Sequence, residues 1–340
     1  MFALLARSVP ELLVSLSPVL LFLAALRFLD SYRLVAFRSL LISLGAGVLA
    51  AVLCLLLNDA LMTATGFERL AYSKSIAPVV EECVKASYII LLIASRRVGF
   101  MVDSAIHGFA VGAGFSVLEN IFYLLALPDA DIFLWLIRGL GTAMMHGAAT
   151  AMVAIVSKTL SERYGPNRPQ VYLPGILLAI AVHAIFNQFF IPALFSTVVI
   201  LLLLPLLMVI VFDRSERATR KWLGVGFDTD RDLLEMLITG NLSETRIGVY
   251  LQSLEDRFKG ETLADMLCLL RIYLELSVSA KGLLLMREAG FEVKPDPETK
   301  EKFTEMKFLE KSIGPTGRLA LLPFLHTSPR DLWQLHLLGS

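Results

Sequence analysis

Nine polar or ionisable side chains occur inside segments that are otherwise almost entirely apolar. Glu81, Glu82 and Lys85 fall in the first turns of the run "IAPVVEECVKASYIILLIAS". On insertion scales a charged residue at a helix centre costs about 2.5 to 3.5 kcal/mol, whereas each Leu, Ile, Phe or Val returns only about 0.3 to 0.6 kcal/mol. The three charges therefore need partners inside the protein rather than lipid. The other six members of the set are Glu119, Asn120, Arg138, His146, His183 and Asn187.

Helical spacing places several of these residues on common faces. Glu81 and Glu82 lie four and three residues before Lys85, and His183 lies four residues before Asn187. Residues three or four apart are neighbours on a helix surface. Two adjacent carboxylates favour a shared proton, and histidine exchanges protons near neutral pH. The residue types therefore predict acid–base chemistry.

Seven apolar segments are long enough to position these groups within a bilayer, whose core takes roughly 20 helical residues to cross. They cover about residues 11–28, 39–57, 76–95, 102–127, 132–157, 171–191 and 192–212. The last two come from residues 171–212, which contain no Asp, Glu, Lys or Arg and would be about 63 Å long as one helix. Pro192 is the expected turn between them. We predict an all-α, polytopic membrane helix bundle.

The basic residues predict the orientation of these spans. Every odd-numbered loop is rich in Lys or Arg, whereas the fourth, "PDAD", has none. The positive-inside rule then puts the N-terminus outside and the C-terminus in the cytoplasm, in a cell inner membrane or plasma membrane. Counting about 1.5 Å per residue, Glu81, Glu82, Glu119 and His183 lie roughly 8 to 12 Å below the outer surface, with His146 deeper at about 20 Å. They predict one polar site in the outer half of the bilayer.

Composition excludes several other classes of function. Apolar residues make up 56% of the 340 residues and charged ones 18%, which is typical of a membrane protein. Equal numbers of basic and acidic residues, 31 each, give no footprint for a nucleic acid. Cys54, Cys83 and Cys268 lack CxxC spacing, so no thiolate zinc site or disulfide framework is expected.

Other residues of the spans are expected to serve the structure. Asp103 and Ser104 open the fourth span, where an N-terminal cap is expected. His107 falls in the other half of the bilayer from the predicted site. Gly108, Gly112, Gly114 and Gly147 are expected to let helices pack closely. Arg138 either reaches outward to the surface or binds a carboxylate.

The charge pattern changes near Asp213 and divides the chain into domains 1–213 and 214–340. The second part is amphipathic, with helical segments ending at Gly240 and Gly290 and another with Ser243 as its cap and Glu244 in its first turn. A lysine-rich segment and a final one from Asp331 to Leu338 follow. We expect a small cytoplasmic helical domain for regulation or for docking a cytoplasmic regulator.

Four motifs in order resemble one family of membrane proteins. These are "EECVK" (EExxK), "FSVLEN" (FxxxEN), a histidine in the next span, and "HAIFN" (HxxxN). Together they resemble the PrsW family of intramembrane proteases over about residues 75–190. CAAX-prenyl endopeptidases and Abi proteins are more distant, because they carry EExxxR and FxxxH.

The resemblance implies a polytopic, all-helical endopeptidase that cleaves membrane-anchored proteins. The family includes site-1 cleavers of membrane-anchored anti-sigma factors. Carried over by motif, the catalytic candidates are Glu81, Glu82, Glu119, His146 and His183. Asn120 and Asn187 are the corresponding polar supports.

Two mechanisms fit these residues. In the favoured one, Glu81 or Glu82 activates water, His183 and Asn187 stabilise the oxyanion, and Glu119 or His146 assists proton transfer. In the other, His146 and His183 with Glu119 or Glu82 form a three-ligand zinc site with an open fourth position.

Besides a protease, two other classes of membrane protein place ionisable groups at this depth, which makes three interpretations in all. A proton-coupled transporter or channel uses carboxylate and histidine chains, but it is usually built from inverted repeats, which this sequence does not show. A receptor without catalysis is the third interpretation.

Overall fold

The computed structural model describes residues 9–188, 192–241, 246–291, 293, 296–325, 333–334 and 338, which are helical or in turns and loops. Over these residues the protein is all-helical, as predicted. The chain divides into two compact units, Met1–Ser215 and Glu216–Ser340. The change of composition near Asp213 lies next to this division.

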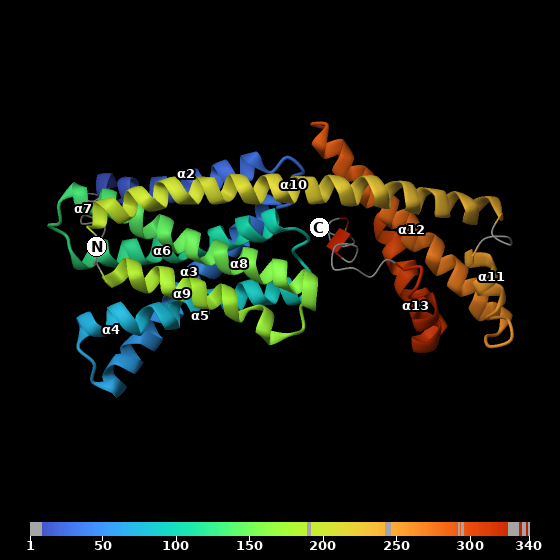
Figure 1. Ribbon diagram of the computed structural model, residues 1–340, viewed down its shortest axis with the longest axis horizontal. Helices are drawn as coiled ribbons and strands as arrows, with labels where there is room; N and C mark the ends of the chain where they lie inside the picture. The colour runs from blue at the N-terminus through green and yellow to red at the C-terminus, as the bar shows by residue number, and fades with distance from the viewer. Residues whose placement is uncertain are drawn as a thin grey trace. The chain divides into compact units, whose positions relative to one another are not determined.

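The first unit is a bundle of long helices (Figure 1). Its order is α2 (Val9–Leu29), α3 (Phe37–Thr65), α4 (Arg69–Ser75), α5 (Ala77–Ala94), α6 (Met101–Ala126), α7 (Ile132–Ile137), the π-helix η1 (Arg138–Ala143), α8 (Met144–Tyr164), the 3₁₀ turn η2 (Pro169–Val171), α9 (Leu173–Gln188) and α10 (Ala193–Thr239). Each of the seven predicted spans overlaps one or more of these helices. The end of the sixth span, 189–191, lies outside the described residues.

Six helices among the described residues are long and apolar enough to cross a membrane. The predicted span that is not among these six is the third, residues 76–95, which corresponds to α5, whose 18 residues include the three charges of the EExxK motif. With three charged side chains in 18 residues, α5 carries more charges than the apolar stretch of any of the other six. The helix packs in the same bundle, against α3, α8 and α9.

Close helix packing centres on α6, which contacts both α3 and α8. A methyl group on Gly112 would clash with the backbone carbonyl of His146, and one on Gly114 with that of Leu44. Glycine permits these approaches because it has no Cβ. The prediction that these glycines serve helix packing is confirmed.

The start of α6 also agrees with the sequence. The Asp103 carboxylate accepts hydrogen bonds from the backbone N–H groups of Gly99, at 2.7 Å, and Phe100, at 2.9 Å. Such a carboxylate satisfies donors that the first helical turn leaves unpaired. The predicted N-terminal cap is therefore confirmed.

Three features of the first unit were missed by hydropathy. The short helix α4 follows the left-handed Gly66, which ends α3. The π-helix η1 interrupts the fifth span one turn before His146. The helix α10 does not end with its apolar segment at 212 but continues to Thr239.

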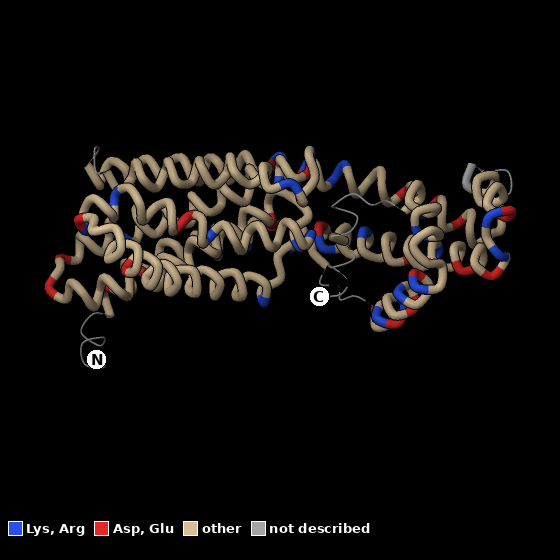
Figure 2. The backbone as a smooth tube through the Cα atoms, turned by 90° about the horizontal axis from the view of Figure 1, so that it is seen from below, with Lys and Arg blue, Asp and Glu red and all other residues tan. Residues whose placement is uncertain are grey.

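The second unit holds the rest of α10 together with α11 (Arg246–Gln252), α12 (Gly260–Glu288) and α13 (Thr299–Leu321). Figure 2 shows that Lys, Arg, Asp and Glu are dense on its helices and sparse along the apolar helices of the first unit. Leu233, Leu270 and Leu274 form a core cluster. The buried Lys281 Nζ lies 2.6 Å from an oxygen of Asp230. The predicted cap at Ser243 and Glu244 and most of the segment from Asp331 to Leu338 lie outside the described residues.

Candidate active site

The EExxK motif forms a buried ion pair within α5. The Lys85 ammonium lies 2.6 Å from Glu82 Oε1, and both side chains are fully buried. The same Glu82 oxygen lies 2.7 Å from Nδ1 of His183 on α9. Glu82 Oε2 is buried without a hydrogen-bond partner among the described residues. Glu82 therefore contacts both Lys85 and His183 through Oε1, and its Oε2 stays available for another partner.

His183 is oriented by two glutamates on successive positions of α5. Its Nδ1 faces Glu82, and its Nε2 lies 3.8 Å from Glu81 Oε2. A hydrogen bond from Nδ1–H to a carboxylate leaves the lone pair of a neutral imidazole on Nε2. The nitrogen that can bind a cation or accept a proton is thus the one beside Glu81.

His146 is in the first turn of α8 and lies between a cation and a carboxylate. Its Nδ1 is 3.1 Å from Lys85 Nζ, and its Nε2 is 3.1 Å from Glu119 Oε2. Its ring centroid is 4.8 Å from that of His183, with the two rings at 89°. The sequence placed His146 deeper than His183 because it assumed a uniform helical rise. The π-helix just before His146 departs from that uniform rise, and in the structure the two rings are in contact.

Glu119 is held by Arg138. The Arg138 Nη2 atom lies 3.3 Å from Glu119 Oε2, and its Nε donates to Asn120 Oδ1 at 2.9 Å. The guanidinium also stacks over the Tyr123 ring, 3.9 Å from its centroid. Of the two alternatives that the sequence left for Arg138, the structure has the one in which it binds a carboxylate. Asn120 supports this arrangement by donating to the Ser15 carbonyl at 3.2 Å.

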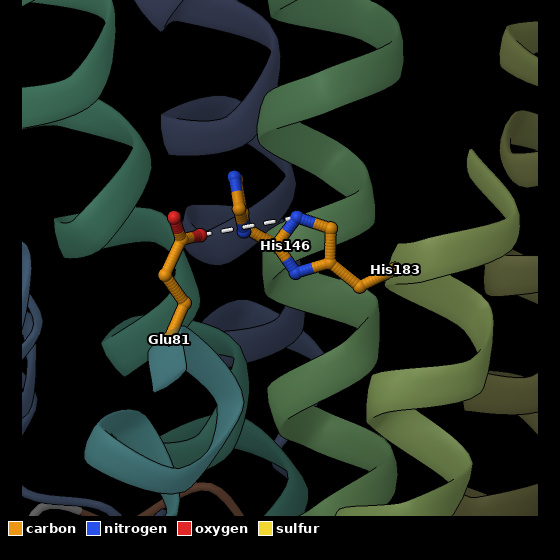
Figure 3. A group of neighbouring side chains, drawn as sticks. All are labelled: Glu81, His146 and His183. Carbon is orange, nitrogen blue, oxygen red and sulfur yellow. Dashed lines mark ion pairs between the residues drawn. The ribbon is translucent and has the colours of Figure 1, made fainter. Parts of the chain in front are cut away.

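Three of these residues bring possible metal ligands together (Figure 3). One ligand atom from each of Glu81, His146 and His183 lies within 4.8 Å of the others. Figure 3 shows the Glu81 carboxylate and the His183 ring pointing toward each other from α5 and α9. From the sequence, the carboxylate of such a group was predicted to be Glu119 or Glu82. In the structure those two are already engaged by Arg138 and Lys85, and Glu81 completes the group.

The charges of the cluster favour a cation. Three carboxylates face two cations, Lys85 and Arg138, so the site has a net negative charge when its carboxylates are ionised and its histidines are neutral. Two imidazoles and a carboxylate are also a usual donor set for zinc, which keeps a fourth position open in catalytic sites.

One sequence candidate lies elsewhere. Asn187 does not face the cluster in this structure: its amide donates to the backbone carbonyl of Ser73 in α4, at 3.2 Å. Asn187 follows His183 by four residues and therefore lies on the same helix face. Four residues also advance about 6 Å along the helix axis, which brings Asn187 level with α4. His107 bonds to Ser43 Oγ at 2.7 Å and belongs to a separate polar contact, as expected.

A groove beside the cluster includes residues that no motif indicated. Its volume is about 430 Å³, and its lining comes from α3, α4, α5 and α6. Glu81 and Glu119 lie on its wall together with Asn58 and Tyr72. The last two were missed because a lone Asn near a helix end and a Tyr in a polar segment carry no spacing signal.

Comparison with known proteins gives one family. The sequence model described as PrsW family intramembrane metalloprotease matches residues 36–212, more than half of the chain. This range includes every helix that contributes an ionisable group to the cluster. No curated protein and no solved structure matches the chain.

Proposed function

The chain belongs to the PrsW family of intramembrane metalloproteases, and we propose that it hydrolyses peptide bonds of membrane-anchored substrates at the Glu81, Glu82, Glu119, His146 and His183 cluster. It is an integral membrane protein with several apolar helices, and its family membership makes it a membrane protease. The proximity of ligand atoms from Glu81, His146 and His183 carries the proposal of the site.

These three residues fit a divalent metal ion. Their donor types match zinc, their surroundings are negatively charged, and the Glu82 contact leaves the His183 lone pair on Nε2, beside Glu81. When bound, a zinc ion polarises a carbonyl oxygen and makes water more acidic. We therefore assign Glu81, His146 and His183 as metal-binding residues.

The remaining residues take roles in proton transfer and orientation. Glu82 Oε2, buried and without a partner among the described residues, accepts the proton of the attacking water. Lys85 holds the other Glu82 oxygen and fixes that carboxylate against the helix. Glu119, held by Arg138, assists the transfer of that proton from Glu82 to the leaving amine.

Metal removal tests this assignment. Full-length protein reconstituted in liposomes should lose cleavage of a single-span test substrate after dialysis against a chelator, and Zn²⁺ should restore it. Variants Glu81→Ala and His183→Ala should bind Zn²⁺ weakly and should not recover. Cleavage that is unchanged after the metal has been removed and its absence verified would contradict the metal assignment.

One observation favours a second mechanism. Both ring nitrogens of His146 are engaged, one by Lys85 and one by Glu119, so a ligand role requires one of these contacts to open. Without metal, a glutamate activates water directly beside His183. This glutamic-type mechanism predicts cleavage that resists the chelator and is abolished by Glu81→Gln or Glu82→Gln.

The wider role follows from the family and from the distribution of charges. We propose site-1 cleavage of a membrane-anchored signalling protein, with the N-terminus outside and the C-terminus in the cytoplasm. The unit formed by residues 216–340 then lies in the cytoplasm. We propose that it docks a regulator.

A further inference from the structure

Glu81 differs from the other two carboxylates of the cluster in its partners. Glu82 is bound by Lys85 and Glu119 by Arg138, whereas Glu81 accepts a hydrogen bond from the neutral amide of Asn58. Asn58 Nδ2 lies 3.4 Å from Glu81 Oε1, while Glu81 Oε2 faces His183. The Glu81 charge is therefore held in place by a neutral donor on one side and stays available on the other.

The Asn58 amide is itself oriented by Tyr72. The Tyr72 hydroxyl donates to Asn58 Oδ1 at 3.0 Å. Because the amide oxygen takes the Tyr72 hydrogen, the amide nitrogen faces Glu81, which requires a donor. Tyr72 is only 3% exposed, so its hydroxyl has little access to water as an alternative partner.

The helix that carries Tyr72 is anchored to the helix that carries His183. Asn187 and Gln188 of α9 donate to the backbone carbonyls of Ser73 and Lys74, at 3.2 and 3.4 Å. These bonds fix the last turn of α4 against α9. A chain of contacts thus runs from Glu81 through Asn58 and Tyr72 to α4, and from there to the helix of His183.

We propose that Asn58 and Tyr72 are positioning residues that hold the Glu81 carboxylate toward His183. The inference rests on the proposed function of Glu81 as a metal-binding group and extends it to α3 and α4. Glu81 has three rotatable side-chain bonds, and 14% of its side chain is exposed toward the groove. Partners that orient a metal-binding group typically change metal affinity or activity by about 10- to 100-fold when they are lost.

The test compares two variants in the reconstituted full-length protein. Asn58→Leu keeps the approximate size of the side chain and removes the amide, and Tyr72→Phe removes only the hydroxyl. Tyr88→Phe is the matched control, because its hydroxyl contacts Ser43, outside the cluster. Zn²⁺ affinity is measured by competition with a chromophoric chelator, and kcat and KM with a fluorogenic single-span peptide.

Asn58→Leu should weaken Zn²⁺ binding and lower kcat by about 10- to 100-fold, with KM within about twofold of the wild type. Tyr72→Phe should act in the same direction but less strongly. The double variant should be no worse than Asn58→Leu, because both act through the same amide. Tyr88→Phe should match the wild type in each measurement.

Two results overturn the proposal. If KM rises while kcat and Zn²⁺ affinity stay unchanged, Asn58 and Tyr72 only line the groove. If the melting temperature falls while kcat and Zn²⁺ affinity stay unchanged, they only support packing.

A Glu81→Gln variant separates this inference from the proposed function. If Glu81→Gln binds Zn²⁺ and cleaves like the wild type, the role of Glu81 and the inference fail together. If Glu81→Gln is inactive while Asn58→Leu and Tyr72→Phe behave like the wild type, only the inference fails.

Discussion

Glu82 lies between a cation and a histidine of the cluster. One of its oxygens contacts both Lys85 and His183, and all of these groups are buried. A buried ion pair contributes little net stability, but removal of one partner leaves an uncompensated charge, which costs about 3 to 5 kcal/mol. Glu82 therefore affects both folding and the orientation of His183, and an experiment must separate the two.

Substitution of Glu82 allows that separation. Glu82→Gln should abolish cleavage and lower the melting temperature, because Lys85 stays buried without its carboxylate. The double variant Glu82→Gln with Lys85→Met should regain most of the stability and remain inactive, because His183 still lacks its carboxylate. Melting in detergent and cleavage in liposomes measure the two effects.

A suitable control is Glu162→Gln, whose carboxylate pairs with Lys158 at 3.5 Å and is partly exposed. It should cleave like the wild type. Recovery of activity in the double variant would show that the Glu82 carboxylate is not required for catalysis.

At the scale of elements, the site depends on how closely α6 approaches α8. Gly112 of α6 lies against the backbone of His146, so the histidine is brought beside Glu119 only because no Cβ intervenes. The π-helix η1 ends at Ala143, just before the same turn of α8. π-Helical turns are frequent at functional sites, where they change the direction of the side chains that follow.

Gly112→Ala should therefore weaken both the packing and the site. Overpacking in a dense interior typically costs about 1 to 3 kcal/mol, and the displaced α8 moves His146 away from Glu119. We expect a lower melting temperature and a loss of cleavage of at least about tenfold, measured as above.

Gly45→Ala provides the matched control, since a Cβ at Gly45 of α3 meets nothing within 4 Å. Its stability should stay within about 1 kcal/mol of the wild type. If Gly112→Ala behaved like Gly45→Ala, close packing of α6 and α8 would not be limiting for the site.

At the scale of the whole molecule, the basic residues predict which side of the membrane each end faces. The loop between α6 and α7 contains Asp129 and Asp131 but no Lys or Arg. The connections with an excess of cations are those predicted to lie inside. Within them or at the adjoining helix ends are Arg33, Arg38, Arg96, Arg97, Arg163 and Arg168. The second unit follows the last span and is expected on the same side as these cations.

Thiol labelling tests this orientation. Cys268 of the second unit is exposed, as is Cys83 of α5, whereas Cys54 is buried. In a Cys83→Ser background, a membrane-impermeant maleimide should label Cys268 in inside-out vesicles and not in intact cells. Asp129→Cys in the same background, at an exposed loop position, should show the opposite pattern. Labelling of Cys268 in intact cells would reverse the proposed orientation.

The sequence by itself determined the helical membrane bundle and the residues that carry its ionisable groups. Long apolar runs specify spanning helices because lipid offers no partner for the backbone, and Glu82 and His183 stand out because a charge in such a run is costly. Span counting also predicts their approximate depth in the bilayer. The position of a residue along a helix axis has one dimension, so counting residues from the end of the span predicts it.

Only the tertiary structure decided which groups meet. The choice of Glu81 over Glu119 in the possible metal group, the use of Asn187 to hold α4, and the contact of Asn58 with Glu81 all depend on side-chain conformations and on which helices are neighbours. Asn58 lies 23 residues from Glu81 in the chain, and nothing in their spacing relates them. Contacts between helices follow from close packing, such as that at Gly112, which hydropathy and periodicity do not specify.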